Sequence, residues 1–134
     1  MRNALLGISL LAASVPAWSD ETSALVDRLN AALKAKDYAA AEADAGELLR
    51  LKPNNPRYEF ELAVTRAQLG KVDGSLAALD ALADMGVLID LNQAAFAPVK
   101  SAPGWPPIAA KFAALRKPEG SMKILIDTVA AHAR

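Results

Sequence analysis

KDYAAAEADAGELLRLKPNN, residues 36–55, contains one predicted helix together with the residues that end it on both sides. The apolar residues within it recur at helical spacing: Ala41, Ala45, Leu48, Leu49 and Leu51. After them, Pro53 and Pro56 enclose two asparagines. Proline has no N–H to donate and disfavours helical geometry in the residue before it, so the helix cannot continue. The segment therefore predicts a helix from Tyr38 to Lys52.

Three further helices are predicted on either side of this segment. An amphipathic pattern covers Ser23–Leu33 before it, and similar patterns cover Arg57–Leu69 and Asp73–Met85 after it. Gly70 and Gly86 follow the last two, where the left-handed residue that ends many helices is usually glycine. Short turns between successive helices predict two antiparallel hairpins and an all-α fold.

An internal repeat links the two hairpins. Tyr38 and Val72 occupy equivalent turns and are 34 positions apart. The same spacing pairs Ala41 with Ser75, Ala45 with Leu79, Leu48 with Leu82, and Leu29 with Ala63. Small residues at Ala41, Ala63 and Ser75 are expected where helix backbones come closest, since larger side chains would overpack there.

This pattern resembles the tetratricopeptide repeat (TPR), whose period is 34 residues. The resemblance rests on the segment 36–55, on the pair Leu62-Ala63 and on the turn Gln68–Lys71, and it covers Thr22–Val87. It implies two stacked TPR-like antiparallel hairpins followed by an incomplete third helical unit, an α-solenoid architecture.

The first repeat departs from the TPR pattern at two positions. Arg28 stands where the motif usually has a large apolar residue, and Leu29 where it has a small one.

The resemblance also implies a concave face on the first helix of each hairpin, able to bind a protein or peptide. The residues expected there are Val26, Asn30, Leu33, Arg57, Phe60, Val64 and Gln68. Each of them can instead be a packing residue or plain surface.

Beyond Val87 the periodicity weakens. The sequence predicts a short helix over Leu88–Ala95, a proline-rich connection over Ser101–Pro107 and a last helix over Pro106–Arg116. Trp105, between glycine and proline, is interpreted as a buried anchor for the connection, with stacking on a ligand as the alternative.

A second resemblance concerns the same region. The repeat pair followed by Asn92–Val99 and Pro103–Leu115 is similar to the helical N-terminal module of exported propeller proteins of the gluconolactonase type. The strand-like run Met122–Ile126 would then open a following domain. This gives an alternative function, as an accessory module of an exported hydrolase whose catalytic domain is absent from this chain.

The N-terminus resembles a secretory signal peptide. Arg2 precedes the apolar run Ala4–Ala13, and the small residues of Ser14–Ser19 follow. The run is about half of the roughly 20 residues that a membrane span needs, which disfavours an anchor. Cleavage is expected before Asp20, with Trp18 as the alternative first residue. The predicted division is a signal peptide over 1–19, a TPR-like domain over 20–116 and a tail over 117–134.

Composition restricts the chemistry. Fifteen basic and fifteen acidic residues cancel, which argues against nucleic acid as a partner. The chain has no cysteine, and its one histidine, His132, lies near the C-terminus. Asp80 and Asp84 share a helix face, but a solvated surface is the simpler interpretation. We therefore expect no catalytic, cofactor or metal residues, and a periplasmic or secreted binding protein without stable membrane insertion.

The predicted export can be tested by intact-mass spectrometry of protein recovered from the periplasm. The measured mass should correspond to a chain that begins at Asp20, because Ala17 and Ser19 supply the small residues before the cleaved bond. Met1 retained on a membrane-bound species would contradict the prediction.

Overall fold

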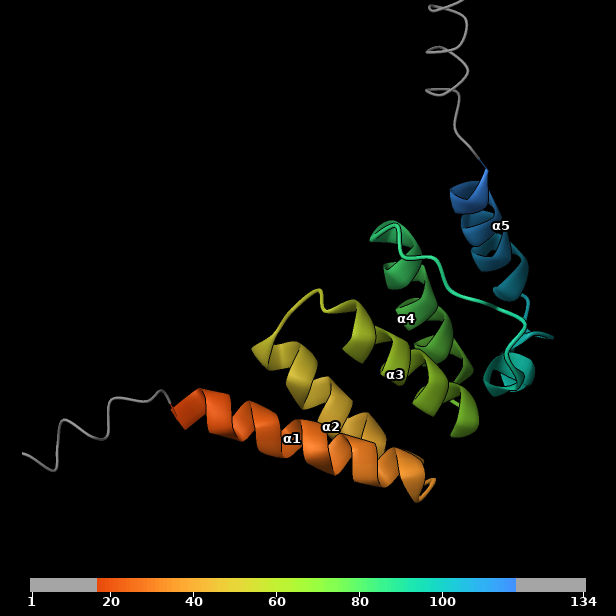
Figure 1. Ribbon diagram of the computed structural model, residues 1–134. Coiled ribbons are helices and arrows are strands. Elements are labelled where there is room, and N and C mark those ends of the chain that lie inside the picture. The colour runs from red at the N-terminus through yellow and green to blue at the C-terminus, as the bar shows by residue number, and fades with distance from the viewer. Residues whose placement is uncertain (1–16, 118–134) are drawn as a thin grey trace, which may run out of the picture.

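The computed structural model describes residues 17–117, and this part of the chain is helical with no strand (Figure 1). In chain order, the elements are α1 (Ala17–Lys34), α2 (Tyr38–Leu51), α3 (Pro56–Gln68), α4 (Val72–Asp84), the 3₁₀ helix η3 (Ala94–Val99) and α5 (Trp105–Arg116). The all-α prediction is thus confirmed for the described residues.

Capping residues set the helix boundaries. The Asp37 carboxylate accepts the N–H of Ala40 at 3.2 Å and begins α2. Asn55 caps α3 by accepting two backbone N–H groups, and Pro56 follows it in the first turn. Gly70 follows α3 in the left-handed region, with φ of 74°. These local signals explain why the predicted boundaries of α2, α3 and α4 lie within a residue of the observed ones. The first helix was predicted to begin at Ser23, but α1 begins at Ala17 and so includes the last three residues of the predicted signal peptide.

Each of the helices α1 to α4 packs chiefly on its neighbour in the sequence. α1 contacts α2, α2 contacts α3, and α3 contacts α4, so that Figure 1 shows α3 between α2 and α4. Four of the pairs with the 34-residue spacing are fully buried: Leu29, Ala41, Ala45, Leu48, Ala63, Ser75, Leu79 and Leu82. The fifth pair, Tyr38 and Val72, begins α2 and α4 and is half-buried.

α3 and α4 approach each other closely at Ala63 and Ser75. The Ser75 hydroxyl donates to the Ala63 carbonyl oxygen at 2.7 Å, and both residues are fully buried. A hydroxyl can reach the carbonyl of another helix only if the two backbones lie close together. The small side chains at these two positions are therefore a requirement of the packing.

An ion pair accounts for one departure from the repeat pattern. Arg28 reaches from α1 to α2, where its guanidinium lies 2.8 Å from the carboxylate of the buried Asp44. The neighbouring Leu29 takes the fully buried position. Arginine at position 28 thus makes a polar contact between α1 and α2.

The prediction of a short helix over Leu88–Ala95 is wrong. Residues 87–90 are not helical, and helical structure resumes only at Ala94, as η3. The Asp90 carboxylate accepts the N–H of Asn92 at 2.9 Å, and the Asp90 carbonyl accepts the side-chain amide of Gln93. These bonds satisfy the local backbone in a turn, which competes with helix formation.

The last helix, α5, packs on α4. Ile108 and Phe112 are buried, whereas Leu115 is 37% exposed. At its start, Gly104 lies so near α4 that a Cβ at this position would be 2.8 Å from Leu76 Cδ1. The absence of a side chain at position 104 therefore allows the connection to approach α4 closely.

No helix in residues 17–117 has the length and apolar character needed to cross a membrane. Residues 1–16 of the predicted signal peptide and 118–134 of the predicted tail lie outside the described part. His132 and the strand-like run Met122–Ile126 lie outside it as well.

Close packing at Ala63 can be tested by enlarging its side chain. Ala63→Leu should lower the free energy of unfolding by about 1–3 kcal/mol, because the added atoms push α4 from α3. The matched control is Ala110→Leu, at an exposed position on α5, which should change it by about 0.5 kcal/mol or less. Equal midpoints of chemical denaturation for the two variants would contradict the packing described.

Candidate functional site

The residues expected on the concave face come from α1 and α3, and we call them together the α1–α3 face: Val26, Asn30, Leu33, Arg57, Phe60, Val64 and Gln68. Its four apolar members are half-buried and pack against the edge of the core. Its three polar members are exposed. The face is therefore a mixed surface with partly accessible apolar side chains.

A polar contact joins the two helices across this face. The Arg57 guanidinium of α3 donates to the Asn30 side-chain oxygen of α1 at 3.1 Å. Both residues are exposed, so the contact adds little stability in water. It does hold two hydrogen-bonding side chains side by side at the surface, where a polar ligand group can meet both.

Part of the α3 side of the face is occupied by the chain itself. The ring of Phe60 packs edge-on against Phe96 of η3, with centroids 6.0 Å apart and an interplanar angle of 84°. Gln68 donates its side-chain amide to the Ala95 carbonyl of η3 at 2.9 Å. Phe60 is thus half-buried by an internal contact, where the sequence predicted an aromatic residue available to a partner.

Glu61 lies on the same side of α3 as the members of the α1–α3 face, but it was not among the residues that the sequence predicted there. It follows Arg57 by one helical turn and is half-buried. Burial raises the pKa of the Glu61 carboxyl, and the charge of Arg57 partly offsets this. The spacing Arg57, Glu61, Val64, Gln68 was readable from the sequence. The burial of the Glu61 carboxylate depends on the neighbouring elements, so the sequence could not predict it.

A different carboxylate, Glu42, connects three elements. Its oxygens lie 3.2 Å from Arg66 Nε of α3 and 2.6 Å from Nζ of Lys71, which precedes α4. The hydrogen bond from Lys71, with a second from Arg66, lowers the pKa of the Glu42 carboxyl. Glu42 and Glu61 therefore have pKa values shifted in opposite directions.

Asp80 and Asp84 do not form an open carboxylate pair. Lys111 of α5 binds both carboxylates and lies 3.0 Å from Asp84. The predicted solvated face is therefore a charged contact between α4 and α5. Across residues 17–117, no group of three or more His, Cys, Asp or Glu side chains is placed to hold a metal ion.

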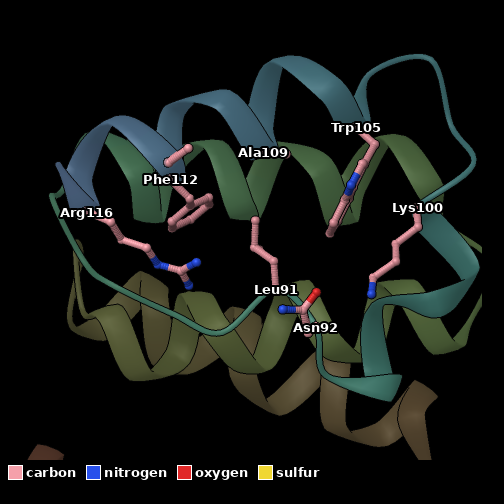
Figure 2. A pocket seen from close by; sticks show the side chains of 8 residues that line it. Leu91, Asn92, Lys100, Trp105, Ala109, Phe112 and Arg116 are labelled. Atoms are coloured by element: carbon pink, nitrogen blue, oxygen red, sulfur yellow. The ribbon is translucent and has the colours of Figure 1, made fainter.

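A pocket of about 290 Å³ lies between the segment 91–100 and α5 (Figure 2). It is lined by Leu91, Asn92, Lys100, Trp105, Ala109, Phe112, Ala113 and Arg116. The Trp105 ring packs against Phe96, with centroids 6.5 Å apart, and also lines the pocket. Trp105 is therefore half-buried and held by Phe96, as expected of an anchor, and part of its surface faces the pocket.

The sequence could not predict this pocket. Its residues come from two segments whose approach depends on η3 and on the packing of α5 against α4.

Comparison with known proteins identifies no relative: no family model, no curated protein and no solved structure matches the chain.

The opposed pKa shifts predict opposite effects of two Glu→Gln variants on stability. The raised pKa of Glu61 makes its ionised form unfavourable in the folded protein, so Glu61→Gln should raise the melting temperature at pH 7. The lowered pKa of Glu42 means that its ionised form stabilises the fold, so Glu42→Gln should lower it.

Both differences should shrink as the pH is lowered. The cost of ionised Glu61 disappears as the pH falls through its raised pKa towards the ordinary value of 4.5. The stabilisation by Glu42 is complete above 4.5 and is lost as the pH falls through its lowered pKa. Thermal unfolding of both variants and the wild type from about pH 3 to pH 7 measures this. Shifts of the same sign at pH 7 would contradict the assignment.

Proposed function

We propose that this chain is a non-enzymatic interaction module built from two TPR-like hairpins and an incomplete third unit. The observation that carries the proposal is the full burial of four pairs of positions with the 34-residue spacing, Leu29 with Ala63, Ala41 with Ser75, Ala45 with Leu79 and Leu48 with Leu82. A repeat whose equivalent positions within the helices are buried against neighbouring helices is expected of stacked hairpins. Sequential packing from α1 to α4 supports the same arrangement.

The proposed binding surface is the α1–α3 face, and the proposed partner is a protein or peptide. Val26, Leu33 and Val64 offer half-buried apolar side chains, which can bury further area when a partner covers them. The adjoining pair Asn30 and Arg57 offers hydrogen-bonding groups at the surface. Apolar contacts bordered by polar groups are the usual composition of a protein interface.

The site of action is proposed to be the periplasm or the cell exterior. This rests on the order of residues in the segment 1–19, a positive start, a short apolar run and small residues before Asp20. The balanced charge of the chain favours a protein partner over a nucleic acid.

Site-specific photo-crosslinking in cells tests the proposed face. Benzoylphenylalanine at Val26 or Leu33 should give a discrete adduct with one partner, because both side chains belong to the face. Ala24 and Ala31 are matched controls, since each is exposed on α1 and lies two residues away, on the opposite side of the helix. The controls should give no such adduct.

Circular dichroism of each substituted protein should first show unchanged helical content. Adducts of equal yield at all four positions, or at the control positions alone, would contradict a binding surface on this face.

A further inference from the structure

The pocket beside α5 has a floor of apolar side chains and cations at both ends. On α5, the lining residues recur at helical spacing and form a single stripe, Trp105, Ala109, Phe112 and Arg116. Leu91, Asn92 and Lys100 complete the opposite wall (Figure 2). Lys100 lies near Trp105 at one end of the pocket, and Arg116 lies near Phe112 at the other (Figure 2).

The positive charge of the pocket is not neutralised by the residues that line it, none of which is acidic. Within residues 17–117, the Lys100 ammonium has no hydrogen bond or salt bridge. Arg116 donates to the Ile89 carbonyl at 2.7 Å and pairs with no described carboxylate. Lys111, on the same helix, differs in being neutralised by Asp80 and Asp84.

Two further donors lie towards the Lys100 end (Figure 2). The side-chain amide of Asn92 and the indole N–H of Trp105 have no hydrogen-bond partner among the described residues. An ammonium, an amide and an indole N–H are all donors to a carboxylate. The Arg116 end differs, since its guanidinium already donates to a backbone carbonyl.

We propose that this pocket binds a small monocarboxylate with an apolar body. Its carboxylate lies at the Lys100 end, and its apolar body lies along Leu91, Ala109 and Phe112 towards Arg116. The volume of about 290 Å³ equals that of about ten water molecules at ~30 Å³ each. A ligand of about ten non-hydrogen atoms therefore fits, and octanoate has this size and shape.

Isothermal titration calorimetry of the full chain with octanoate tests the proposal. Octanoate should bind with a Kd of about 1 mM or tighter, as expected for a ligand of this size in an open pocket. Octan-1-ol, which keeps the apolar body and lacks the charge, should bind at least about tenfold more weakly, because the charge-assisted hydrogen bonds are missing.

A pair of lysine variants locates the carboxylate. Lys100→Gln should weaken octanoate binding by about tenfold or more and leave octan-1-ol binding unchanged. The control is Lys52→Gln, at an exposed lysine after α2 that is not part of the pocket, and it should leave the affinity for octanoate as in the wild type. Thermal melts of both variants check that the fold is intact.

Three results would overturn the proposal: no heat of binding with octanoate at about 5 mM, equal affinities for octanoate and octan-1-ol, or equal losses in the two lysine variants. A fourth is self-association of the wild type, seen by sedimentation and abolished by Lys100→Gln, since a second copy would then occupy the pocket. The α1–α3 face shares no residue with the pocket, so each proposal can fail without the other.

Discussion

The hydrogen bond from the Ser75 hydroxyl to the Ala63 carbonyl oxygen fixes the contact on which the rest of the structure depends. It requires α3 and α4 to approach with only small side chains between them. α3 in turn packs on α2 and η3, and α4 packs on η3 and α5. The α3–α4 pair is therefore the support against which both the α1–α3 face and the α5 pocket are positioned.

The two proposed binding regions meet at one buried aromatic residue. Phe96 is fully buried, packs edge-on against Phe60 of the α1–α3 face and tilts against Trp105 of the pocket. η3 thus covers part of the α1–α3 face and supports Trp105 in the wall of the pocket. η3, which lies outside the 34-residue pattern, therefore determines how much of the α3 surface is accessible.

The sequence predicted what depends on neighbours along the chain and missed what depends on neighbours in space. Helix boundaries followed from local signals such as Asp37, Asn55 and Gly70, whose effects extend over one turn. The burial of Glu61 and the contact of Phe60 with η3 were not predicted. The turn at Asp90 is an exception, because its hydrogen bonds are local and it was still missed. Arg28 looked like a departure from the repeat because its partner, Asp44, lies on another helix.

Sequential packing has a consequence for the order in which the molecule assembles. α1 to α4 form their contacts between segments joined by turns of a few residues, so little chain entropy is lost when each pair closes. η3 and α5 have a surface to pack on only after α3 and α4 have met. We therefore expect the pocket beside α5 to form last during folding, and local unfolding of α5 to open it while α1 to α4 stay packed.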